Sequence, residues 1–118
     1  MDRRRTKMDL REDTSGDVTI LEIKGRIDST TAPVLGEKLT ASLTTPQCRL
    51  VLDLRQLEYI SSAGFRVLLL AARRAEEVGA RFVLCSVTGK VRQLFDLGGF
   101  LDLFAISGSR GDAITAVQ

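Results

Sequence analysis

The spacing of apolar residues alternates along the chain between the twofold repeat of strands and the longer repeat of helices. Strands are predicted at residues 10–13, 18–24, 49–54, 82–86 and 104–106. Helices are predicted from residues 29–31 to about 43, from 62 to 78, from 88 or 89 to about 98, and from 112 to 117. Ser29, Thr30 and Thr31 offer hydroxyl caps for the first of these helices. Segments 49–54 and 82–86 are almost wholly apolar, which is typical of strands that are covered on both faces.

This order of elements predicts one α/β domain with a mixed central sheet of four to five strands and about four helices. The first two strands, joined by a turn at residues 15–17, should form an antiparallel pair, and helical crossovers should link the later strands. The chain has 118 residues, enough to bury one core of ordinary size. Residues 1–7 hold four basic residues and one acidic residue, so we expect a basic tail there and the domain at residues 8–118.

The composition argues against several classes of protein. A formal net charge of +2 is too small to favour direct binding to nucleic acid or membrane. The absence of histidine excludes the usual Ser-His-Asp hydrolase and removes the commonest zinc ligand. Cys48 and Cys85 are widely spaced, which predicts reduced thiols of a cytosolic protein. No apolar run reaches the length of about 18 residues that a membrane span needs. We therefore expect a cytoplasmic protein that is not an enzyme and holds no metal or cofactor.

Two adjacent hydroxyls, Ser61 and Ser62, stand where an apolar segment ends and the longest predicted helix begins. A serine at a helix start satisfies backbone N–H groups that lack a partner in the helix. The same position attracts an added phosphate, because the N–H groups and the helix dipole favour negative charge. The junction is therefore either an ordinary cap or a cap that can be switched.

The helix predicted at 62–78 has a core side and a solvated side. The core side holds Leu68, Ala71, Ala72 and Ala75. The solvated side holds Ser62, Arg66, Arg73, Glu76 and Glu77, and Leu70 projects among these charges. A leucine framed by charges near a phosphorylatable hydroxyl indicates a transient partner surface, although neighbouring elements could cover it.

Three segments in order carry a family resemblance. They are residues 21–28 followed by Thr31 and Ala32, residues 50–54 leading to 59–65, and residues 94–104. Over nearly its whole length the chain resembles the STAS domain family, and within it the small stand-alone anti-sigma factor antagonists of bacteria. The resemblance implies a phosphoprotein that regulates transcription by switching partners.

In that family, the resemblance implies, a partner kinase phosphorylates one serine or threonine at the start of the second helix. The kinase is itself the anti-sigma factor and has a histidine-kinase-like ATPase fold. The unphosphorylated antagonist binds it and releases the sigma factor, the phosphorylated form cannot bind, and a serine phosphatase resets the cycle.

Alignment of the family motif on Gly64 and Phe65 places Ser62 at the phosphorylated position. Ser61 stands where the family commonly has an acidic residue, which makes Ser61 the alternative site. Asp28 matches an acidic residue that lies near the phosphosite and at the kinase surface. The predicted partner-binding residues are Asp28, Ser61, Ser62, Gly64, Arg66 and Leu70.

Two other functions stay open. The domain could be a STAS subunit of a lipid-transport complex, a stressosome-like assembly or a transporter. It could instead be a small nucleotide-binding domain, because Thr88-Gly89-Lys90 faintly resembles a phosphate loop. That segment lacks the glycine spacing of a Walker motif, so a plain helix start is the favoured interpretation.

Overall fold

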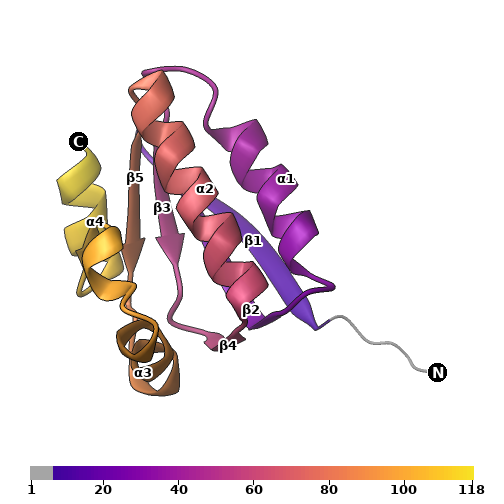
Figure 1. The fold of residues 1–118 in the computed structure, drawn as a ribbon. Coiled ribbons are helices and arrows are strands. Elements are labelled where there is room, and N and C mark those ends of the chain that lie inside the picture. The colour runs from indigo at the N-terminus through magenta and orange to yellow at the C-terminus, as the bar shows by residue number, and fades with distance from the viewer. Residues whose placement is uncertain (1–6) are drawn as a thin grey trace.

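The computed structural model describes residues 7–118 (Figure 1). Its strands are β1 (Met8–Ser15), β2 (Val18–Ile27), β3 (Arg49–Asp53), β4 (Leu57–Ile60), β5 (Arg81–Cys85) and β6 (Ile106–Ser107). Its helices are α1 (Ala32–Ser42), α2 (Ser62–Val78), α3 (Gly89–Leu97) and α4 (Arg110–Val117), with a short 3-10 helix at Leu101–Leu103. Lys7 lies just before β1, and the rest of the predicted basic tail, residues 1–6, lies outside the described residues.

The strands form one mixed sheet in the order β1-β2-β3-β5-β6. Strand β4 pairs with the last residues of β2, after the part of β2 that pairs with β3. Only β1 and β2 pair antiparallel, through the predicted hairpin; β3, β4, β5 and β6 pair parallel with their neighbours. The predicted α/β class, the mixed sheet and the helical crossovers are therefore confirmed. Strand β4 was not predicted; it has four residues and pairs with β2 across an irregularity at Gly25 and Arg26.

Helices cover both faces of the sheet (Figure 1). Alternate residues of a strand point to opposite faces, and the two buried clusters follow this rule. Leu21, Ile23, Leu50, Leu52 and Leu84 lie in the larger cluster with α1 and α2. Val18, Ile20, Val51, Val83 and Cys85 lie in a smaller cluster with Ala113 and Val117 of α4. The α1–α2 layer therefore forms the main core, and α4 covers part of the opposite face.

Helix α2 begins and ends as the sequence predicts, and it lies in front of the sheet in Figure 1. Gly79 ends it in the left-handed conformation at φ +77°, which glycine adopts without steric cost. Buried Phe65 fixes its first turn: the ring stacks on Phe100 at 4.1 Å between centroids and meets Phe95 edge-on at 4.8 Å. The start of α2 is thus held by the segment that follows β5.

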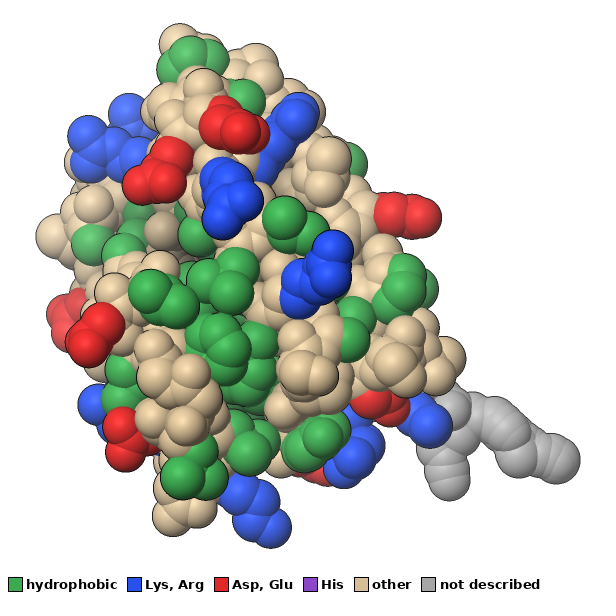
Figure 2. Space-filling model, in the orientation of Figure 1, with side chains coloured by type: hydrophobic (Ala, Val, Ile, Leu, Met, Phe, Trp, Pro, Cys, Tyr) green, Lys and Arg blue, Asp and Glu red, His purple; other side chains and the backbone are tan. Residues whose placement is uncertain are grey.

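The face of the molecule that α1 and α2 cover also exposes apolar side chains, as Figure 2 shows. Within residues 7–118, the large apolar side chains with high exposure are Val34, Leu70, Leu97 and Leu103. None of the helices in this part of the chain is long and apolar enough to cross a lipid bilayer.

Candidate functional site

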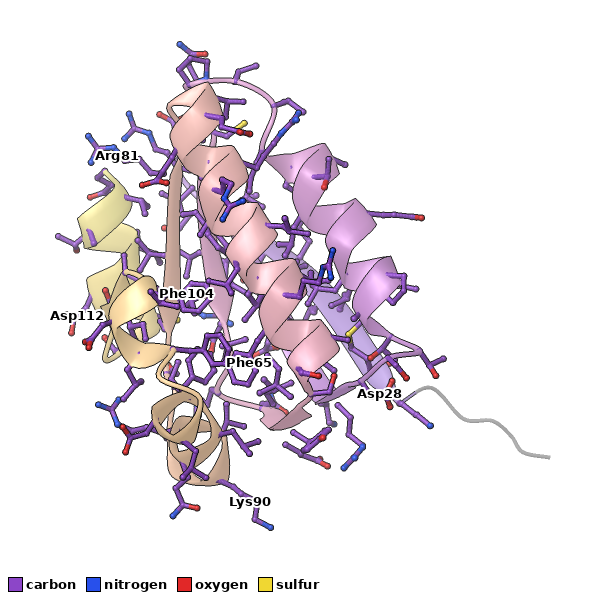
Figure 3. All side chains as sticks on the ribbon, viewed as in Figure 1. Asp28, Phe65, Arg81, Lys90, Phe104 and Asp112 are labelled. Carbon is purple, nitrogen blue, oxygen red and sulfur yellow. The ribbon has the colours of Figure 1, made fainter. Side chains whose placement is uncertain are left out.

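The ends of β2 and β4 bring Asp28 and the two serines to one edge of the sheet. These strands are parallel neighbours, with Ile27 opposite Ile60. The N–H of Ser61 donates to the Ile27 carbonyl at 2.8 Å, so the residues that leave the two strands start side by side. Figure 3 shows Asp28 at the end of the molecule where α2 begins. Asp28 and Ser61, which are 33 positions apart in the sequence, therefore lie at one site because β4, the strand that was not predicted, pairs with β2.

The two serines have different roles. Ser61 is the N-cap of α2: its backbone is extended, and its Oγ accepts a hydrogen bond from the Gly64 N–H at 3.3 Å. Ser62 is the first residue of the helix, and its side chain is exposed. No other residue of 7–118 forms a side-chain hydrogen bond with the Ser62 hydroxyl. The sequence left open an ordinary cap or a switchable cap at this junction, and the structure divides it into a capping residue, Ser61, and an exposed hydroxyl next to it, Ser62.

Asp28 organises the loop before α1. Its Oδ1 accepts hydrogen bonds from the N–H groups of Thr30 at 2.9 Å and Thr31 at 3.1 Å. The Asp28 N–H donates to the Thr31 Oγ1 at 2.8 Å, and Lys7 Nζ lies 3.7 Å from Asp28 Oδ2. The Thr31 N–H, and to a smaller extent the Thr30 N–H and the Lys7 charge, lower the pKa of Asp28 below its ordinary value. Asp28 is therefore an anion at neutral pH.

This arrangement corrects the expected cap of α1. A hydroxyl of Ser29, Thr30 or Thr31 was predicted to cap the helix, but Thr31, its N-cap, makes no such bond. The Asp28 carboxylate instead accepts the hydrogen bonds of the loop N–H groups. A charged acceptor binds N–H groups more strongly than a neutral hydroxyl does, which explains the preference.

Gly64 lies inside the fold, beneath the serines. A Cβ atom on this residue would lie 2.6 Å from Ile60 Cγ1 and 2.8 Å from Ile27 Cγ2. These distances are too short for carbon atoms, so only glycine lets the first turn of α2 approach β2 and β4 this closely. Gly64 is buried, and it contributes to the site by positioning Ser61 and Ser62.

Arg66 and Leu70 lie on the surface, one and two turns beyond Ser62. Arg66 is exposed, and Leu70 keeps 52% of its surface exposed. The spacing of four residues places Ser62, Arg66 and Leu70 on one stripe of α2. Neighbouring elements leave this leucine uncovered, as the partner-surface interpretation of the sequence requires.

The site offers an accessible hydroxyl at a helix start, with the Asp28 carboxylate at the end of the adjacent strand. A phosphate on Ser62 would meet the positive end of the α2 dipole and the N–H groups of the first turn. Within the part of the chain that the structure describes, no group of three or more Asp, Glu or Cys residues has the geometry of a metal site. Segment 88–90, which faintly resembles a phosphate loop, is the start of a helix: Thr88 is the N-cap of α3, and Gly89 and Lys90 are its first two residues.

Sequence reasoning missed the surroundings of Asp28. It placed Lys7 in the tail and gave Thr31 only the role of a cap, whereas both contact Asp28. The Thr31 contact had a local signal, because an aspartate three residues before a threonine is typical of a side chain that binds the following turn. The contact with Lys7 depends on the hairpin that places Met8 opposite Gly25.

Comparison with known proteins bears on the family and the fold of the chain. The model of the STAS domain family matches residues 10–113. BtrV of Bordetella bronchiseptica, which carries the provisional name anti-sigma factor antagonist, is 38% identical over 111 residues, covering 94% of this chain and 96% of its own.

Solved structures share the fold. The crystal structure of an anti-sigma factor antagonist from Mycobacterium paratuberculosis superimposes with a TM-score of 0.77 at 25% identity, over 93% of each chain. SpoIIAA of Bacillus in its phosphorylated form superimposes with a TM-score of 0.67 at 16% identity, over 93% of this chain and 100% of that one. The identity to SpoIIAA is low, so this second likeness concerns the fold alone.

Proposed function

Since the chain belongs to the STAS domain family, we propose that it is an anti-sigma factor antagonist, a binding protein and not an enzyme, with its domain at residues 8–118. In its unphosphorylated state it binds an anti-sigma factor that is also a serine kinase, and so releases a sigma factor. The names of its relatives support the role of antagonist. The observation that carries the proposal is the exposed Ser62 hydroxyl at the start of α2, left free because Ser61 serves as the cap.

Phosphorylation of Ser62 is the proposed switch. The Ser62 Oγ attacks the γ-phosphorus of ATP held by the kinase, ADP leaves, and the hydroxyl proton passes to a base of the kinase. A serine phosphatase later hydrolyses the phosphoserine and restores the hydroxyl. SpoIIAA, a protein of the same fold, has been solved in a phosphorylated form.

The phosphate acts at the interface rather than on the fold. It adds a charge of about −1.5 to −2, which the N-terminus of α2 accommodates without melting. Beside Asp28, which is already an anion, the added charge repels acidic groups of the partner and must lose its water on docking. A loss of about 3–4 kcal/mol would weaken binding a few hundredfold, enough for a switch without a large conformational change.

The test is a phosphorylation assay with purified candidate kinases of the same genome, ATP and Mg²⁺. We expect one phosphate per chain, mapped by mass spectrometry to Ser62, and none on the Ser62→Ala variant. The matched control is Ser61→Ala, which removes the neighbouring hydroxyl and should still accept phosphate. Phosphate on Ser61 alone would move the switch to the cap residue and overturn the assignment.

A binding measurement tests the mechanism separately. Titration calorimetry with the same kinase should show tight binding of the wild-type chain and much weaker binding of Ser62→Asp. If Ser62→Asp binds as tightly as wild type, repulsion between a negative charge at position 62 and the kinase is not the cause of the switch. If the chain is captured instead by a lipid-transport or transporter assembly and by no ATPase, the antagonist function is wrong.

A further inference from the structure

A groove lies between α1 and α2, beyond the Ser62 site. It has a volume of about 450 Å³, and its floor is apolar, formed mainly by Gly36, Leu39, Val67, Leu70 and Ala71. Leu70 belongs both to this groove and to the stripe of α2 that begins at Ser62. The groove is therefore continuous with the switch site along one helix.

The groove is open because α1 carries a glycine, which has no side chain, where it faces α2. A Cβ atom at Gly36 would lie 3.6 Å from both methyl carbons of Val67, an ordinary contact distance. An alanine at position 36 would fit there without strain and gain helix propensity. The glycine thus leaves space that the packing of the two helices does not require.

Charges on the rim differ between the two helices. On α2, Arg66 and Arg73 flank Leu70 by one turn on either side, and both are exposed. Neither arginine makes an ion pair with another residue of 7–118. On α1, the rim carries the exposed carboxylate of Glu37. Next to Leu70, α2 accordingly presents two cations, whereas α1 presents the Glu37 carboxylate.

We propose that this groove receives an amphipathic helix of the anti-sigma factor, with an apolar ridge on the floor and acidic residues facing Arg66 and Arg73. This inference rests on the proposed function. A helix that lies in a groove between two helices buries its apolar row and pairs its flanking charges with the rim. A second copy that docks symmetrically through the same groove is a poor occupant, because it would present the same arginines to Arg66 and Arg73.

The groove gives the complex affinity, and Ser62 gives it a switch. Leu70 is eight residues beyond Ser62, which corresponds to about 12 Å along the helix axis, more than the screening length of about 8 Å at physiological salt. A phosphate on Ser62 therefore acts weakly on the floor of the groove. Filling the groove should weaken binding without changing which serine is phosphorylated.

The test compares Gly36→Leu, which fills the groove, with Leu97→Ser, which removes an 85%-exposed leucine from α3. With a purified kinase that phosphorylates Ser62 in the assay described above, we expect Gly36→Leu to bind at least tenfold more weakly and Leu97→Ser to bind like wild type. Gly36→Leu should keep its melting temperature and still accept phosphate on Ser62 at saturating kinase. If Gly36→Leu binds like wild type while Ser62→Asp does not, the groove proposal fails and the switch stands. If wild type binds no such kinase, both proposals fail.

A photo-crosslink identifies the occupant. Benzoylphenylalanine at Thr40, an exposed residue of the groove, should crosslink to an acidic amphipathic helix of the kinase. Crosslinks between two copies of this chain, or to a basic or non-helical segment of the kinase, would overturn the proposal.

Discussion

Ser61 Oγ accepts a hydrogen bond from the Gly64 N–H at 3.3 Å, while the hydroxyl of the next residue, Ser62, is exposed. Two chemically identical neighbours thus have different surroundings. Ser61 satisfies the backbone of the first turn, and Ser62 remains available to a modifying enzyme.

This division predicts different stability effects for two adjacent substitutions. Ser61→Ala should lower the free energy of unfolding by about 1 kcal/mol, because the first turn of α2 loses its cap. Ser62→Ala should change it by less than about 0.5 kcal/mol, as for most exposed positions. Urea denaturation of the two variants beside wild type measures both values. Equal losses would show that the cap is shared between the serines.

A second pair of substitutions tests how closely the first turn of α2 packs on β2 and β4. Gly64→Ala should destabilise the fold by roughly 1–3 kcal/mol, because its Cβ would collide with Ile60 and Ile27. Gly36→Ala is the matched control: it is also a helical glycine, its Cβ meets only Val67 at 3.6 Å, and it should stabilise by up to about 1 kcal/mol. Thermal unfolding of both variants gives the comparison. A stable Gly64→Ala variant would mean that β2 and β4 yield easily to the extra methyl group.

The sequence predicted the helices well because their signals are local. The apolar spacing of α2, the glycine at position 79 and the serines at its start all lie within the helix or next to it. Strand β4 gave no such signal: Leu57–Ile60 is too short to show a repeat. Its identity as a strand depends on pairing with β2, about 33 residues earlier, which no local pattern reports.

The candidate site was predicted in part for the same reason. The motif around Gly64 located Ser61 and Ser62, but which serine is the cap depends on their backbone conformations. The resemblance placed Asp28 near the serines, whereas its hydrogen bonds to the loop and its contact with Lys7 require the hairpin and the β2–β4 pairing. A single sequence also does not show what fraction of the Leu70 side chain stays exposed once the neighbouring helices have packed.

Asp28 predicts how stability depends on pH. Its folded-state pKa lies below the ordinary value of 3.8, so between these two values the unfolded chain binds more protons than the folded chain. The stabilisation by Asp28 is therefore complete above the ordinary value and is lost as the pH falls through the folded-state pKa. Asp28→Asn keeps an acceptor oxygen but lacks this titration. The difference in melting temperature between wild type and Asp28→Asn should be largest near neutral pH and should shrink in acid. A difference that is constant with pH would contradict this role.

The two cysteines should differ in reactivity. Hydrogen bonds, first from the Thr45 hydroxyl, lower the pKa of Cys48 to about 7, while burial raises that of Cys85 to about 11. Iodoacetamide should therefore modify Cys48 first in the folded protein, since only the thiolate reacts. The rate should reach half its maximum near pH 7, as followed by mass spectrometry, and Thr45→Val should move that midpoint upward. A midpoint near the ordinary pKa of 9.0 in wild type would contradict the effect of Thr45.

Arg110 joins the start of α4 to the sheet. Its Nε donates to Asp53 Oδ2 at 2.9 Å, and its Nη2 lies 3.3 Å from Glu22 Oε2. Asp53 is only 3% exposed and is the one buried charged residue of the described chain. Removal of Arg110 would leave this buried carboxylate without its charged partner, with the Arg55 N–H, which donates to Asp53 Oδ1 at 3.0 Å, as a remaining donor. Loss of one partner of a buried pair costs more than the pair itself contributes.

Arg110→Ala should lower the free energy of unfolding by about 2–3 kcal/mol, below the usual range for a buried pair because the arginine side chain is 34% exposed. The double variant Arg110→Ala with Asp53→Asn should recover part of this loss, because the buried group is then neutral. Urea denaturation of wild type, the single variant and the double variant measures the recovery. Equal stability of the single and double variants would show that water reaches Asp53 once the arginine is gone. The junction between α4 and the sheet would then depend on Ala113 and Val117 rather than on charge.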